Sequence, residues 1–179
     1  MIDLVTDALV TFLQTRVPDV GTWTVHSLSN ADTAPAKDKP VIALIAVDEH
    51  EHTRNRPLVD TLNGLQRPPL QLRLEYLLTY VGKHDEAQKR LSRVVSAFHT
   101  RPILGSGELS PALAEQVERV TVRLRNTTAD ERNQIWSALG RNGRLSLFYT
   151  VDVAPAPLLP DADGERRTRS HEIDYVGAP

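Results

Sequence analysis

Residues 67–80 read Arg-Pro-Pro-Leu-Gln-Leu-Arg-Leu-Glu-Tyr-Leu-Leu-Thr-Tyr and alternate between apolar and polar side chains along most of their length. Successive side chains of a β-strand point to opposite faces, so a period of two predicts a half-buried strand rather than a helix. The two prolines favour extended backbone at the start of the run. The predicted buried face consists of Leu70, Leu72, Leu74, Tyr76, Leu78 and Tyr80. The predicted outer face consists of Gln71, Arg73, Glu75 and Thr79.

The rest of the chain supplies further strands and a smaller number of helices. Apolar residues at helical spacing predict two helices, and the capping box Thr128–Glu131 opens a third, short one. The predicted helices are residues 2–16, residues 85–100 and the segment from 128 to 139. The predicted strands are residues 22–25, 41–47, 70–80, 117–125 and 145–153, of which 41–47 is apolar throughout and typical of a central strand. These elements predict an α+β domain, with a mostly antiparallel four- to five-stranded sheet and two to three helices on one face.

Two segments fall outside this regular pattern. Residues 48–66 form a long charged stretch, and loops of such length in compact domains are usually functional. After the last predicted strand come Pro155, Pro157 and Pro160 and then a charged tail. We therefore expect one domain over residues 1–155 and a proline-rich linker with a C-terminal arm over residues 156–179.

Composition excludes several classes of function. The chain has 179 residues, a net charge of -2 and a pI near 6.3, so we expect no binding to nucleic acid. The absence of cysteine excludes disulfides and thiolate nucleophiles. The N-terminus lacks the basic region of a secretory signal, and the longest apolar run, residues 41–47, is too short to cross a membrane. We expect a cytoplasmic protein without direct membrane insertion.

Glu49-His50-Glu51-His52 is the first candidate for chemistry. On a strand, two histidines two residues apart share a face and offer two ligands to a metal. The helical zinc pattern requires histidines four residues apart, and no third ligand lies nearby in the sequence. We therefore predict no metal site, no cofactor and no catalytic residue. A small metal-dependent enzyme that uses His50 and His52 with a distant carboxylate stays open as an alternative.

Arg54-Asn55-Arg56 follows in the same long charged stretch. Two guanidinium groups beside an amide suit a carboxylate or backbone partner on another subunit. The outer face of the 70–80 strand offers Arg73 and Glu75 as opposite charges for a similar contact. In the tail, Ile173 and Tyr175 alternate with acidic residues, which fits a strand added to the edge of a partner's sheet. These seven residues are the candidate interface residues.

Four segments taken together resemble a known family. They are the N-terminal helix Met-Ile-Asp-Leu-Val-Thr-Asp-Ala-Leu at residues 1–9, the loop ending in Arg54-Asn55-Arg56, the strand of residues 67–80 with its helix running to Leu104, and Ile-Trp-Ser-Ala-Leu-Gly at residues 135–140 leading into the strand at residues 144–151. In this order they resemble the cap, or tail-terminator, family of phage-tail-like contractile injection systems, over about residues 1 to 155.

The resemblance implies a structural protein without catalysis or cofactor. It implies a homohexameric ring at the membrane-distal end of the particle, where the ring contacts inner-tube and sheath proteins and stops their polymerisation. It also implies assembly in the cytoplasm, with release of the particle by lysis. A phage head–tail joining protein would also assemble as a ring and is a second structural alternative.

Overall fold

The computed structural model describes residues 1–51, 57–61 and 64–156. The helical elements are α1 (Ile2–Arg16), the 3-10 turn η1 (Pro18–Val20), α2 (His84–Thr100), α3 (Pro111–Ala114) and α4 (Ala129–Ala138). The strands are β1 (Thr24–Val25), β2 (Lys39–Glu49), β3 (Val59–Thr61), β4 (Gly64–Gln66), β5 (Leu72–Val81), β6 (Ile103–Leu104), β7 (Val117–Leu124) and β8 (Ser146–Pro155).

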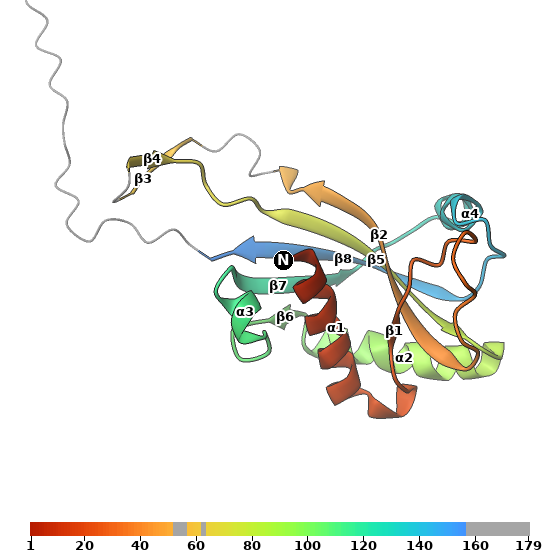
Figure 1. Cartoon of the computed structure of the whole chain (residues 1–179). Helices are drawn as coiled ribbons and strands as arrows, with labels where there is room; N and C mark the ends of the chain where they lie inside the picture. The colour runs from red at the N-terminus through yellow and green to blue at the C-terminus, as the bar shows by residue number, and fades with distance from the viewer. Residues whose placement is uncertain (52–56, 62–63, 157–179) are drawn as a thin grey trace, which may run out of the picture. The chain divides into compact units, whose positions relative to one another are not determined.

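Six of the described strands form one sheet in the order β1-β2-β5-β8-β7-β6 (Figure 1). Every neighbouring pair is antiparallel except β1 and β2, which are parallel. The predicted α+β class with a mostly antiparallel sheet is confirmed. The sixth strand, β6, was not predicted, because two residues are too few to show a period of two.

The strand that opened the sequence analysis is β5, at the centre of the sheet. Leu74, Tyr76 and Leu78 are buried as predicted. Leu70 precedes the strand and is 54% exposed, so its predicted burial is wrong. Thr79 was predicted on the outer face and is fully buried instead, where its hydroxyl donates to the Leu145 carbonyl at 2.8 Å. That bond satisfies the polar group that burial removes from water.

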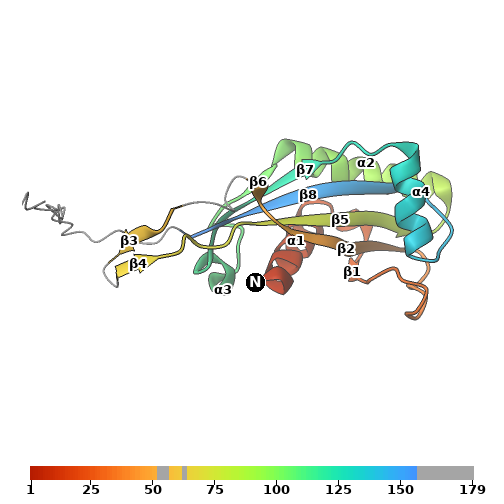
Figure 2. The ribbon, with the colours of Figure 1, turned by 90° about the horizontal axis from the view of Figure 1, so that it is seen from above.

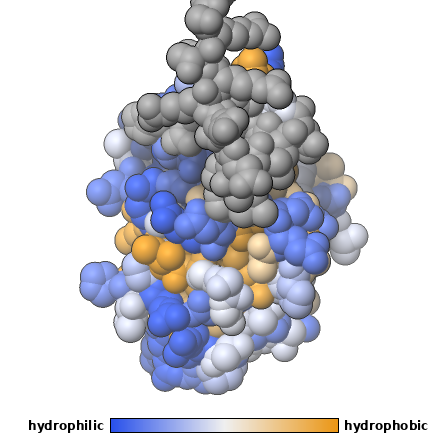
Figure 3. Space-filling model, turned by 90° about the vertical axis from the view of Figure 1, so that its left-hand side faces the viewer, coloured by the Kyte–Doolittle hydropathy of each residue, from blue (hydrophilic) through white to orange (hydrophobic). Residues whose placement is uncertain are grey.

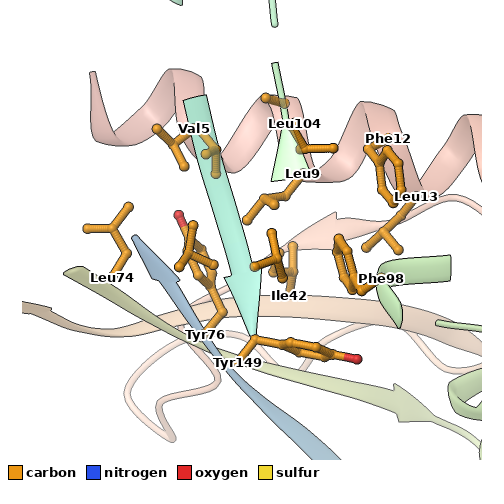
Figure 4. Packing of buried hydrophobic residues seen from close by; sticks show 14 of the residues in the cluster. Val5, Leu9, Phe12, Leu13, Ile42, Leu74, Tyr76, Phe98, Leu104 and Tyr149 are labelled. Atoms are coloured by element: carbon orange, nitrogen blue, oxygen red, sulfur yellow. The ribbon is translucent and has the colours of Figure 1, made fainter. Parts of the chain in front are cut away.

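The main core lies between one face of the sheet and the helices α1 and α2 (Figure 4). Phe98 of α2 stacks on Phe12 of α1, with ring centroids 5.3 Å apart, and meets Tyr149 of β8 edge-on at 5.0 Å. The Tyr76 hydroxyl shares a hydrogen bond of 2.8 Å with the Thr6 hydroxyl. Burial raises the pKa of Tyr76 to about 12, although the bond to Thr6 acts in the opposite direction. Tyr76 therefore stays neutral and ties α1 to the middle of the sheet.

A second, smaller core lies on the opposite face of the sheet, under α4. Trp136 of α4 packs there with Leu77 of β5, Phe148 of β8, and Val41 and Ala43 of β2. We predicted all helices on one face, and α4 differs from that prediction (Figure 2). The adjacent pair Leu77-Leu78 indicates that both faces of the sheet are covered, because neighbouring strand residues point to opposite faces and both of these leucines are buried.

The charged stretch of residues 48–66 is more regular than predicted. β2 continues through it as far as Glu49, and β3 pairs with β4 as a separate two-stranded hairpin. The chain divides into two compact units, of which the first comprises Met1–Asn55 and Pro69–Pro157 and the second contains this hairpin. The six-stranded sheet and both cores belong to the first unit.

The predicted capping box at the start of α4 is confirmed, and it gives a test of this helix. The Thr128 hydroxyl accepts from the Glu131 backbone N–H at 3.2 Å, and the Glu131 carboxylate accepts from the Thr128 backbone N–H at 2.7 Å. We expect Thr128→Ala to lower the free energy of unfolding by about 1 kcal/mol, measured by urea denaturation. Thr127→Ala, one residue earlier, is the matched control, and an equal loss in both variants would contradict a capping role.

Candidate assembly interface

One part of the sheet face that carries α4 is lined by charged side chains. α4 covers the end of this face near Leu77 and Phe148, and charged residues line the face toward the other end of the strands. Alternation along β5, β7 and β8 places every second residue of these strands here, opposite the main core. We call this region the charged face, and its members are Arg73, Glu75, Arg123, Arg125 and Asp152.

Asp152 of β8 is at the centre of the charged face. Its carboxylate accepts from Arg73 Nε of β5 at 3.1 Å and from Arg123 of β7 on the other side. His50 Nε2 lies 3.8 Å from the same carboxylate, and the Asp152 side chain is only 15% exposed. The Asp152 carboxylate pairs with a guanidinium group on each side and so links β5, β8 and β7. Because Asp152 is largely buried, loss of either arginine would leave its charge poorly solvated.

A second chain of charges runs from the sheet to α4. Arg125, just after β7, donates to the Glu75 carboxylate of β5 and lies 3.4 Å from Glu131 of α4. The backbone N–H of Thr128 holds the pKa of Glu131 below its usual range, and Arg125 acts in the same direction. The lowered pKa keeps Glu131 ionised near neutral pH. Arg125 thus bridges Glu75 of the sheet and Glu131 of α4.

The candidate interface residues from the sequence fall into two groups. Arg73 and Glu75 lie on the charged face, and both form ion pairs within the chain. Arg54, Asn55, Arg56, Ile173 and Tyr175 lie outside the described residues. Sequence reasoning missed Asp152, the residue that connects Arg73 and Arg123. Its signal in the sequence is that it is the one charged residue of β8, where it stands between Val151 and Val153.

The histidine alternative gains no support from the described part of the chain. His50 Nε2 lies 3.4 Å from an Arg73 guanidinium nitrogen, a cationic neighbour that opposes metal binding at that atom. Within residues 1–51, 57–61 and 64–156, no group of three or more His, Asp or Glu side chains is placed to hold a metal ion. His52 lies outside these ranges.

Hydrophobic side chains also reach the surface of the domain. Seen from the end at which α3 lies, hydrophobic patches interrupt a mostly hydrophilic exterior (Figure 3). Val47 of β2 and Leu124 of β7 are 45% and 49% exposed, although both belong to the six-stranded sheet. Both strands lie next to the outermost strands of the sheet, β1 and β6, and exposed apolar side chains on an uncovered sheet edge favour pairing with another chain.

None of the helices described by the structure has both the length and the apolar character needed to cross a bilayer. The fold defines an α+β scaffold domain that carries a charged face on one side of its sheet.

The chain belongs to the family of the Pvc16 N-terminal domain, whose model matches residues 4–167. The resemblance to the cap, or tail-terminator, family is thereby confirmed, and the match continues past Pro155, where we expected the domain to end.

Two solved structures share the fold. The sheath/tube terminator, in its extended state, of the extracellular contractile injection system PVC has a TM-score of 0.55 and 18% sequence identity, over 91% of this chain and 58% of that one. The tube-terminating cap of the anti-feeding prophage has a TM-score of 0.57 and 19% identity, over 91% of this chain and 57% of that one. This chain thus spans less than three fifths of either protein. No curated protein sequence matches it.

Proposed function

We propose that this chain is a structural cap of a contractile injection system, which forms a homohexameric ring and ends polymerisation of the inner tube and sheath at the membrane-distal end of the particle. Its partners are further copies of itself, the inner-tube protein and the sheath protein. No catalytic step or cofactor belongs to this function. Assembly takes place in the cytoplasm, and lysis releases the finished particle.

The observation that carries the proposal is the family match over residues 4–167, together with the fold shared with two tube terminators over 91% of the chain. The physical character of the domain supports it. A terminator needs a rigid body with one surface matched to the last tube layer and another that offers no docking site to a further layer. A six-stranded sheet with a core on each face supplies the rigidity.

The proposed contact residues divide between the sheet and the segments beside it. Arg73 and Glu75 present charge on the sheet and are positioned by Asp152 and Arg125. Arg54, Asn55 and Arg56 lie in the stretch of chain that joins β2 to β5, and we assign them to contacts with a neighbouring subunit. Loops carried by a rigid scaffold are the usual place for such contacts.

A direct experiment tests the cap itself. The chain is expressed with the tube and sheath proteins of its own particle, carries a short affinity tag after Met1, and is labelled with gold for electron microscopy. We expect one gold cluster at a single end of each particle. Gold distributed along the sheath, or particles without gold, would contradict the proposal. Omission of the chain should give tubes of variable length, because no subunit then ends their growth.

A truncation tests the proposed role of the C-terminal arm. We expect deletion of residues 157–179 to leave the domain folded, because the core residues and main-sheet strands that the structure describes precede residue 157. Binding to particles should weaken at least tenfold if Ile173 and Tyr175 add a strand to a partner. Co-sedimentation with particles measures the binding, and thermal unfolding verifies the fold. Unchanged binding would remove the arm from the interface.

A further inference from the structure

Both edges of the six-stranded sheet are only partly covered within the described chain. On one edge, β1 pairs with β2 only at Val41 and Ile42. On the other edge, β6 pairs with β7 only at Val120 and Thr121, and the Val122 backbone N–H donates to the Pro102 carbonyl at 2.7 Å. Among the described residues, β2 therefore has an open edge from Ala43 to Asp48, and β7 has one after Val122. Open strand edges are templates for pairing with another chain.

The strand register relates the levels of the two openings. The register across β2, β5, β8 and β7 aligns Val47 with Leu74, Val151 and Val122. It likewise aligns Leu44 with Tyr76, Tyr149 and Leu124. The uncovered part of β7 thus begins two residues along the strands from the row that holds Val47. A second copy placed beside the first with a stagger of two residues along the strands brings Val47 level with Leu124.

Strand direction also permits this pairing. Three successive antiparallel pairs separate β2 from β7, so the two strands run in opposite directions. In a ring whose strands tilt relative to the ring axis, neighbouring copies are staggered along the strands but each copy keeps its direction. β7 of one copy then meets β2 of the next in antiparallel orientation. A contact between two different surfaces of identical subunits is the kind that closes a ring.

The backbone groups on these edges point outward at matching positions. The His50 N–H donates to the Gln71 carbonyl, so alternation turns Val47 away from β5. The Arg125 N–H donates to the Phe148 carbonyl, so alternation turns Leu124 away from β8. Val47 and Leu124 therefore have their own N–H and C=O groups available for a pair with each other across two copies.

The side chains select the same register. With Val47 opposite Leu124, both exposed apolar side chains lie on the face of the main core, because their cross-strand neighbours Leu74 and Tyr149 belong to that core. The next pair joins Asp48 to Arg123 on the charged face. Asp48 is exposed, and the Arg123 side chain is 58% exposed beside Asp152. Opposite charges directly across two strands stabilise the pairing.

Each edge has room for the side chains of a neighbour. Beside β2, a hollow of ≈ 620 Å³ is lined by Leu44, Ile45 and Ala46 together with part of α4. Beside β7, a hollow of ≈ 380 Å³ is lined by Phe98, Val122, Leu124 and Tyr149, among others.

We propose that β2 of one copy pairs with β7 of the next copy through Val47–Leu124 and Asp48–Arg123, joining neighbouring sheets edge to edge around the ring. This proposal rests on the ring of the proposed function and specifies its contact. The occupant of each open edge is thus the complementary edge of a second copy of this chain.

A cysteine cross-link tests the register, because the natural chain contains no cysteine. Asp48 and Arg123 would form a pair without backbone hydrogen bonds, with Cα atoms about 4.5 Å apart, within the range of a disulfide. We expect the full chain with Asp48→Cys and Arg123→Cys to give a ladder of covalent oligomers on oxidation. The control pair Asp48→Cys and Arg119→Cys uses another exposed arginine of β7, four residues away, and should give none.

A charge exchange tests the same contact without a covalent bond. Asp48→Arg alone and Arg123→Asp alone should each weaken self-association roughly tenfold, and the double variant should restore most of it. Sedimentation measures the association. If the natural chain forms rings, but the cysteine variant gives no cross-link and the double charge variant does not regain association, the edge pairing is contradicted. The ring of the proposed function is not contradicted by that result. A chain that stays monomeric at every concentration would contradict both.

Discussion

Replacing Leu74 by alanine is expected to lower the free energy of unfolding by about 2–5 kcal/mol, since a large-to-small change at a filled position removes apolar contacts and leaves a cavity. Leu74 is fully buried in the main core, near the start of β5, among side chains of the sheet and α1 (Figure 4). Urea denaturation measures the loss, with an unchanged m-value as evidence that the unfolding transition itself is the same.

Leu70→Ala is the matched control for this substitution. Leu70 continues the same alternation in the sequence, but it precedes β5 and is 54% exposed. We expect its replacement to change stability by no more than about 0.5 kcal/mol. Similar losses in the two variants would show that the buried strand begins earlier than Leu72 and would contradict the described boundary.

The two leucines show how much of the fold is predictable from the sequence. Alternation identified β5, β7 and β8, and the capping box located α4, because both signals are local. The burial of Thr79 depends on what covers the second face of the sheet, and that is α4, some 50 residues further along the chain. A period of two reports one buried face, whereas a strand covered on both faces loses the contrast on which the period depends.

The candidate interface was predictable to a similar degree. Arg73 and Glu75 were identified as polar residues on the outer face of one strand. Their partners Asp152 and Arg125 were not, because they are brought close by the strand order β5-β8-β7, which differs from the order along the chain. Cross-strand ion pairs between distant segments leave no spacing in the sequence. Family resemblance supplied what residue patterns could not, namely the kind of assembly to consider.

The removal of the Trp136 side chain is the other change with a large expected effect. We expect Trp136→Ala to lower the free energy of unfolding by about 3–5 kcal/mol, because an indole leaves a larger void than a leucine does. Trp136 is the buried residue of α4 in the second core, where it meets Leu77 and Phe148. Trp136→Phe keeps most of the apolar volume and should cost clearly less.

The spectroscopic consequence separates a cavity from the loss of the whole helix. If α4 detaches, the contact between Arg125 and Glu131 is lost with it, and helical circular dichroism falls before global unfolding. If only a cavity forms, the helical signal stays constant and a single transition moves to lower urea. Stability equal to that of the natural chain would contradict the second core, and α4 would then be an attachment to the sheet rather than part of its folding unit.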